Sequence, residues 1–350
     1  MIRKTNKRSW NNPQNIEKFQ NYISTALENK LIGGDSIDTL NNTIMETIQK
    51  ARKKYCPGKK REQKISHNTR KLIEERRLLI SNKEAKENRS LKVLKRNLAK
   101  GKTEIVKLQN RNNGIEHNRN KLIEIVEKFY EELCRSHRNE NSTLLLITAE
   151  KGVLNQESED IPEITTGKIQ NALRKMKNNR SPSDDEIVIE AIKIGGEIIM
   201  KKIETLFNLC LQDATIYYRW NNAVMILLHK KSDKTNLENY RPISLLDHLY
   251  KLFTRIITTR MENKLDLYQP REQAEFCSNF RTNDHLQSLK VLIEKSVEYN
   301  RPLVSLFVDF QKAFDTIEHN NILIALKECQ INYRYTKIIH KIFINKQQQQ

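Results

Sequence analysis

The stretch from Leu303 to Asp309 restricts the fold of this chain more than any other segment. Residues 303–308 are almost all apolar and rich in Val, Leu and Phe, and the run ends in a single carboxylate. A short run of this kind predicts a buried strand. A carboxylate at the end of a rigid strand suits a hard cation, because such a cation prefers oxygen ligands in a fixed geometry. The alternative is an aspartate that caps the amphipathic helix predicted from Ile317 to Leu326.

The charge of the chain indicates a polyanionic partner. The formal net charge is +19 over 350 residues. Between Lys50 and Lys128 there are 25 Lys and Arg residues but 9 Asp and Glu residues, so this region holds most of the excess. Such an excess favours contact with nucleic acid, although a solvated helical surface is the alternative.

Several other classes of protein are disfavoured. The five cysteines are isolated, without the spacing of a zinc site or a redox pair, and predict free thiols in a reducing compartment. No signal peptide opens the chain and no apolar run has the length of a membrane span. We therefore expect an intracellular protein, nuclear or cytoplasmic, with no membrane partner.

The N-terminal third predicts mainly helices. Residues 1–50 carry apolar anchors at helical spacing and predict two short amphipathic helices, with Ser36 or Asp35 as N-cap of the second. Residues 122–133 predict another helix. Its Tyr130 could stack on a base, but at this spacing a place in the core is the more common role.

Residues 66–108 predict a long, basic, weakly amphipathic helix or helix pair. Arg76, Arg77, Lys95 and Arg96 are candidate phosphate contacts there. Such contacts position a nucleic acid without reading its sequence.

The second half alternates helical and strand patterns. Thr165 and Thr166 could cap a helix, a basic turn spans Lys175 to Asp185, and residues 223–229 predict a strand. The clearest helical stripes cover residues 198–211 and 249–265.

Two motifs carry a family resemblance. The segment Phe307–Asp315 resembles the first palm motif of reverse transcriptases from non-LTR retrotransposons, and Asn239–Leu246 resembles their fingers motif. The motifs stand in the order that the family requires, and the resemblance covers roughly residues 160–330. It implies an RNA-directed DNA polymerase with an RNA template, a DNA primer, deoxynucleoside triphosphates and Mg²⁺ or Mn²⁺ as partners.

The resemblance also implies roles for individual residues. Asp309, assisted by the backbone carbonyl of Phe310, would be the first metal-binding carboxylate. Phe314 would be the gate that rejects a ribose 2′-hydroxyl. The turn residues Lys230 and Lys231, together with Arg241, would contact the incoming triphosphate or the template backbone. For both lysines an ordinary charged turn is the alternative.

The chain departs from the family pattern at several positions. Ser183 and Glu275 stand where glycine is usual, and Cys277 replaces an arginine. The family's later metal ligands are paired aspartates, but no Asp follows Asp315. The earlier pair at 184–185 has polar flanks, and we interpret it as helix-capping.

These departures predict a truncated copy that does not polymerise by itself. A non-catalytic, basic RNA- or DNA-binding protein derived from such an element is the alternative. The expected fold class is α+β, with four parts: a basic helical connector (1–135), a linker (136–163), a partial fingers and palm domain (164–346) and a low-complexity tail (347–350). An incomplete sheet would expose an unpaired edge at Leu303–Asp309 and favour aggregation.

Overall fold

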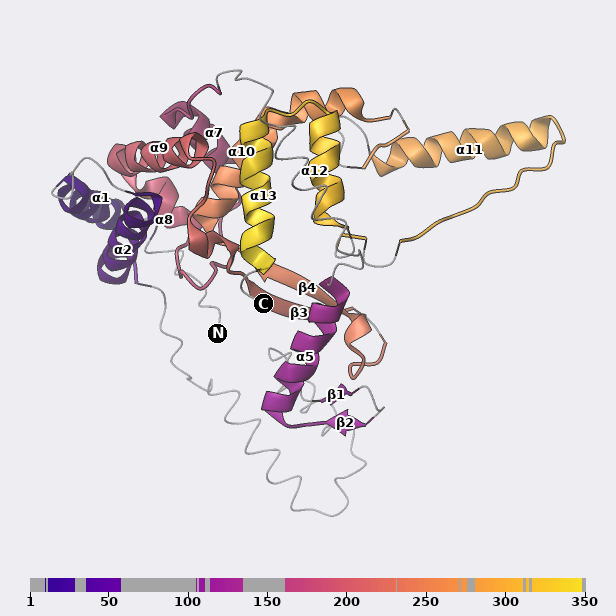
Figure 1. The fold of residues 1–350 in the computed structure, drawn as a ribbon, viewed down its shortest axis with the longest axis horizontal. Coiled ribbons are helices and arrows are strands. Elements are labelled where there is room, and N and C mark those ends of the chain that lie inside the picture. Colours follow the sequence, from indigo (N-terminus) through magenta and orange to yellow (C-terminus); the bar gives the residue numbers. More distant parts are fainter. Residues whose placement is uncertain are drawn as a thin grey trace, which may run out of the picture. The chain divides into compact units, whose positions relative to one another are not determined.

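A computed structural model describes most of the second half of the chain and parts of the first (Figure 1). The described residues are 10, 12–28, 36–57, 105, 107–110, 114–134, 161–230, 232–270, 272–275, 281–310, 313–314 and 317–347. They divide into two compact units. The large unit contains the described residues within Arg8–Cys56, Glu132–Val224 and Ser244–Gln350, and the small unit contains those within Pro57–Glu131 and Met225–Ile243. The basic segment 66–104 lies outside the described residues, as do Arg76, Arg77, Lys95 and Arg96.

The large unit is helical. Its α-helices are α1 (Pro13–Glu28), α2 (Ile37–Tyr55), α7 (Thr166–Lys175), α8 (Ile189–Ile194), α9 (Gly196–Gln212), α10 (His248–Tyr268), α11 (Thr282–Glu298), α12 (His319–Glu328) and α13 (Tyr333–Gln347). A short 3-10 helix, η3, spans Tyr218–Asn221. The helices predicted at 198–211 and 249–265 are confirmed as α9 and α10. No described helix is long and apolar enough to cross a membrane.

The N-terminal pair of helices forms where the sequence predicts it. Ser36 is the N-cap of α2, and its hydroxyl oxygen accepts a hydrogen bond from the Thr39 backbone N–H at 3.2 Å. This bond satisfies one of the amides that the first turn of a helix leaves unpaired. Helices α1 and α2 pack on each other and both also pack on α9.

An aromatic cluster lies at the centre of the large unit. Phe207 of α9, Trp220 of η3 and Phe253 of α10 are fully buried. The ring centroids of Phe207 and Phe253 are 5.1 Å apart, and those of Trp220 and Phe253 are 5.7 Å apart. Burying a side chain such as Phe stabilises a fold by roughly 1.5–3 kcal/mol, so this cluster is a main source of stability.

The small unit contains most of the described strand residues, most of one α-helix and a short 3-10 helix, η4 (Leu237–Asn239). Strands β1 (Leu108–Gln109) and β2 (Ile115–Glu116) pair antiparallel, with Leu108 opposite Glu116. Helix α5 (Arg119–Cys134) follows, which confirms the helix predicted at 122–133. Tyr130 is buried, as its core role predicts.

A second two-stranded sheet completes the described β structure. It joins β3 (Val224–His229) and β4 (Tyr240–Leu245), which are hydrogen-bonded neighbours. The strand predicted at 223–229 is therefore confirmed as β3. A helical unit combined with short strands confirms the α+β fold class.

The strand predicted at Leu303–Asp309 is wrong. Residues 301–310 have no regular secondary structure, and the side chains of Val304 and Phe307 are 92% and 80% exposed. A strand is stable when a neighbour satisfies its N–H and C=O groups. The described strands pair only with one another, β1 with β2 and β3 with β4, so this segment has no partner strand among them.

Candidate functional site

Asp309, the predicted metal ligand, lies on the exposed segment that follows α11. Among the residues that the structure describes, its carboxylate has no hydrogen-bond or ion-pair partner. Phe310 and Phe314 are also exposed, at 76% and 77%. The described residues contain no group of three His, Cys, Asp or Glu side chains that could hold a metal ion. The described carboxylates therefore do not fit a metal centre.

The fingers motif has a different environment, because it forms β4. Tyr240 is 5% exposed, and its hydroxyl donates a hydrogen bond to the Lys234 carbonyl at 2.8 Å. Its ring lies edge-on to that of His229 at a centroid distance of 5.2 Å. These contacts anchor the start of β4 in the core of the small unit.

The turn between β3 and β4 is held by its own polar groups. The Lys230 N–H donates to the Asn239 carbonyl at 2.8 Å, and the Asn239 side-chain amide donates to the Asp233 carbonyl at 2.9 Å. The hydroxyl and backbone N–H of Thr235 both donate to the Asp233 carboxylate, and these hydrogen bonds lower the pKa of Asp233.

This ordered turn presents cations to solvent. Lys230 follows β3, Arg241 lies on β4, and both side chains are exposed. Lys231 lies outside the described residues. The sheet thus holds two of the three predicted nucleotide-contacting residues on one supported hairpin.

The basic turn 175–185 packs against the end of the fingers motif within the large unit. The Ser183 hydroxyl donates to the Leu245 carbonyl at 2.9 Å. The backbone φ of Ser183 is not positive, whereas Asn179 and Glu186 have φ values of 60° and 52°. A glycine is therefore not required at 183 for its backbone conformation, and serine contributes a hydrogen bond that glycine would lack.

The interpretation of Asp184 and Asp185 as helix-capping residues is wrong. Helix α8 has Val188 as its N-cap and no side-chain cap. Asp185 is instead half-buried, with one carboxylate oxygen out of contact with solvent, and its charge interacts with that of Asp247, the residue that precedes α10. The physical reason is that the Asp185 carboxylate accepts a hydrogen bond from the Ile187 backbone N–H, which precedes the N-cap, and not from an amide of the first turn of α8.

Two hydrogen bonds from α2 fix this turn. The Gln49 side-chain amide donates to the Asp185 carbonyl at 2.7 Å, and the Arg52 guanidinium donates to the Glu186 carbonyl. Asp185 also accepts a hydrogen bond from the Ile187 backbone N–H at 3.1 Å. The turn is therefore joined to both α2 and the residues before α10.

Burial changes the proton affinity of this cluster. Burial, and then the charge of Asp247, raises the pKa of Asp185 to about 8. Burial raises the pKa of Asp247 to about 6, and it lowers the pKa of His248 to about 4. Close to neutral pH, Asp185 therefore holds a proton and His248 is neutral.

Sequence reasoning did not find this carboxyl pair. Asp185 belongs to a turn and Asp247 precedes a helix, and neither position indicates burial. The only signal was that Asp247 stands directly before a strong apolar helical stripe, the usual place of an N-cap.

Comparisons with known proteins agree with the two motifs. A family described as "Reverse transcriptase (RNA-dependent DNA polymerase)" matches residues 228–350, a range that contains both motifs. The chain is 29% identical over 175 residues to the "Retrovirus-related Pol polyprotein from type-1 retrotransposable element R1" of Bradysia coprophila, covering 49% of this chain and 17% of that protein.

Two further relatives are similar over nearly half of the chain. The "RNA-directed DNA polymerase from mobile element jockey" of Drosophila melanogaster is 26% identical over 175 residues, 49% of this chain and 19% of that protein. The "Transposon TX1 uncharacterized 149 kDa protein" of Xenopus laevis is 26% identical over 164 residues, 47% of this chain and 12% of that protein. The chain thus spans less than a fifth of the length of each of these relatives.

Proposed function

We propose that this chain, whose sequence is that of a reverse transcriptase of the non-LTR retrotransposon type, supplies the fingers and the first palm motif of an RNA-directed DNA polymerase. The observation that carries the proposal is the β3–β4 hairpin. It builds the fingers motif into a supported sheet, with Tyr240 buried and Arg241 exposed.

The hairpin suits the binding of phosphate groups. The planar guanidinium of Arg241 can donate two parallel hydrogen bonds to phosphate oxygens, and Lys230 adds a compact positive charge. Together with Lys231 they are the proposed contacts to the incoming triphosphate or the template backbone. An RNA template, a DNA primer and deoxynucleoside triphosphates are the proposed substrates.

The proposed roles at the palm motif are those implied by its sequence. Asp309 and the Phe310 carbonyl would be metal ligands, and Phe314 would exclude the ribose 2′-hydroxyl. Mg²⁺ or Mn²⁺, when bound in polymerases of this kind, activates the primer hydroxyl and neutralises charge on the triphosphate. Since the described carboxylates do not fit a metal centre, no catalytic step is assigned to this chain.

We infer that the 350-residue polypeptide does not extend a primer by itself. Two metal ions need more than one carboxylate, and no Asp follows Asp315 in the sequence. Primer extension on an RNA template, with Mg²⁺ or Mn²⁺ and with Asp309→Ala as control, tests this inference. We expect no product from either protein. Product from the parent that disappears in Asp309→Ala would show that a complete metal site forms, and would overturn the inference.

A non-catalytic RNA- or DNA-binding protein is the second candidate function. The charge distribution favours it, because the excess of 16 positive charges between Lys50 and Lys128 includes the proposed phosphate contacts Arg76, Arg77, Lys95 and Arg96. Photo-crosslinking of a radiolabelled deoxynucleoside triphosphate separates the two candidates. A polymerase fragment should crosslink less after Arg241→Ala than after the matched change Arg255→Ala on α10. Equal yields would favour the second candidate.

A further inference from the structure

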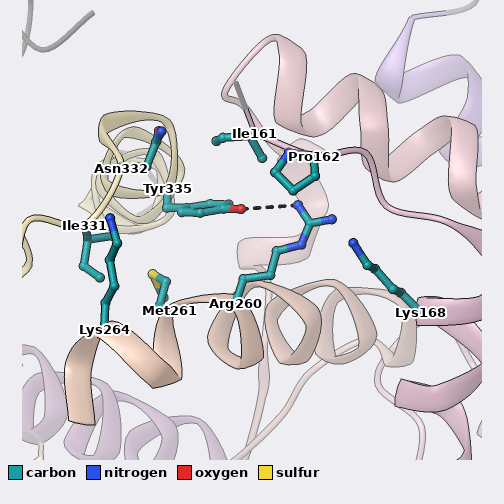
Figure 2. A pocket seen from close by; sticks show the side chains of 9 residues that line it. All are labelled: Ile161, Pro162, Lys168, Arg260, Met261, Lys264, Ile331, Asn332 and Tyr335. Carbon is teal, nitrogen blue, oxygen red and sulfur yellow. Dashed lines mark hydrogen bonds between the residues drawn. The ribbon is translucent and has the colours of Figure 1, made fainter. Parts of the chain in front are cut away.

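A pocket of about 250 Å³ lies within the large unit (Figure 2). Three segments that are distant in the sequence form it: residues 161–168 at the start of α7, residues 260–264 of α10, and residues 331–335 at the start of α13. None of the site residues named above lines this pocket, so it is a separate feature of the fold.

The charges in this pocket are of one sign. Lys168, Arg260 and Lys264 line it, and none of the nine lining residues is acidic. In Figure 2 the charged ends of Lys168 and Arg260 point toward one another. Like charges that share a pocket repel, and this repulsion is relieved when an anion binds between them.

Arg260 is held in position by its neighbours. Its guanidinium donates one hydrogen bond to the Tyr335 hydroxyl at 3.2 Å and one to the Glu163 carbonyl at 2.9 Å. A guanidinium has five N–H donors, so these two bonds leave three, of which the Nε–H is buried and the other two belong to the terminal nitrogens. An arginine fixed in this way loses little side-chain entropy when it binds an anion, and its planar fork matches phosphate oxygens.

The remaining lining residues limit the size and type of ligand. Pro162, Met261 and Ile331 form apolar walls, and Asn332 adds a side-chain amide. A volume of about 250 Å³ is below the roughly 300–1,000 Å³ of pockets that take drug-sized ligands. The pocket therefore suits one phosphate group with an adjoining sugar better than a whole nucleoside triphosphate.

We propose that this pocket binds one phosphate group of a nucleic-acid backbone. The choice of nucleic acid as the source of the phosphate rests on the proposed function, whereas the preference for a phosphate rests on the pocket itself. The contact adds an anchoring point to the large unit, separate from the β3–β4 hairpin.

The test is the salt dependence of RNA binding, measured by fluorescence anisotropy with a labelled single-stranded RNA and the full chain. The variant Lys168→Met/Lys264→Met removes two pocket charges but keeps the apolar stems of both side chains. The control Lys201→Met/Lys290→Met removes two exposed charges of α9 and α11, each in an ion pair with a glutamate one helical turn away. Both proteins lose the same net charge.

We expect the slope of log K against log salt to fall in magnitude by roughly 0.7 for the pocket variant, the value for one single-strand phosphate contact, and to stay unchanged for the control. Equal slopes and affinities for the two variants would overturn the proposal. If the parent chain bound no RNA at all, the proposed function would fail first, so the two failures are distinguishable.

Lysine acetylation followed by mass spectrometry tests the site without any substitution. Bound RNA should slow the acetylation of Lys168 and Lys264 several-fold relative to Lys201 and Lys290. Protection by a deoxynucleoside triphosphate at lower concentration than by RNA would overturn the backbone as the ligand, and inorganic phosphate serves as the reference for the phosphate group alone.

Discussion

The two motifs that carry the family resemblance have opposite structural environments. The fingers motif forms a paired strand whose first residue, Tyr240, is buried and hydrogen-bonded. The palm motif begins on an unpaired segment, where Phe307 is exposed. Residues 303–308 form the more apolar stretch of the two and are rich in strand-forming Val and Phe, so composition does not explain why the other stretch is the one that forms a strand. The difference is explained by a hydrogen-bonding neighbour: β4 has β3 beside it, whereas residues 303–309 have no partner among the described strands.

The largest expected effect separates the packed core from the exposed segment. Phe253→Ala should lower the free energy of unfolding by about 3–5 kcal/mol, because it opens a cavity between Phe207 and Trp220. Phe307→Ala deletes the same aromatic ring at a position that is exposed to solvent. It should change the free energy of unfolding by less than about 0.5 kcal/mol. Urea unfolding followed by circular dichroism measures both. Comparable losses would mean that Phe307 is buried in solution.

A smaller, pH-dependent effect distinguishes the turn that supports the fingers motif. The pKa of Asp185 in the folded chain is about 8, above its ordinary value of 3.8, so the folded state binds more protons than the unfolded state between these values. Stability contributed by this proton is present at about pH 4 and is lost as pH rises toward 8, with a slope that approaches about 1.4 kcal/mol per pH unit.

Asp185→Asn should remove most of this pH dependence and raise stability at pH 8 relative to the parent. Thermal unfolding between pH 5 and 9 gives the profile, and Asp266→Asn, at an exposed position of α10, serves as the control. An unchanged profile in Asp185→Asn would assign the pH dependence to other groups.

A third test concerns a single hydrogen bond of the fingers motif. Tyr240→Phe deletes the bond to the Lys234 carbonyl and should cost about 1 kcal/mol. Tyr299→Phe changes an exposed tyrosine and should cost almost nothing. Chemical denaturation at one pH compares the two. If Tyr240→Phe is neutral, water replaces the lost partner.

The last variant should have the smallest effect on stability but a large effect on solubility. Val304→Lys/Phe307→Lys places two charges on the exposed apolar segment and should leave the unfolding midpoint nearly unchanged. It should reduce aggregation, because charges on an unpaired edge oppose pairing with another chain. Light scattering against concentration measures this. A parent chain that is already monodisperse at high concentration would contradict the premise.

Much of the helical structure could be predicted from the sequence, because its signals are local. The apolar stripes that became α9 and α10 have helical period, and Ser36 stands directly before the apolar face of α2. Strand β3 and the turn of Lys230 were also predicted, whereas no strand was predicted at β4, which carries Arg241. The segment Leu303–Asp309 was not, because a strand depends on a partner that its own sequence does not specify.

Local sequence patterns likewise could not predict the interior contacts of the candidate site. Ser183 and Leu245 are separated by 62 residues, and Gln49 and Asp185 by 136. An aspartate in a polar turn has the same appearance in the sequence whether it faces water or is buried. The raised pKa of Asp185 follows from that burial, and only the three-dimensional structure reveals it.

The packing of α1 and α2 against α9 determines when these helices can fold during synthesis. Helix α2 ends at Tyr55 and α9 ends at Gln212, so synthesis must continue through the intervening residues before the partner surface exists. At about 5–20 residues per second, this delay is on the order of ten seconds or more. During that time Ile23, Ile44 and Ile48, which are fully buried in the folded chain, lack part of the core that buries them. The pair α1–α2 is thus expected to complete its packing only after α9 has been synthesised.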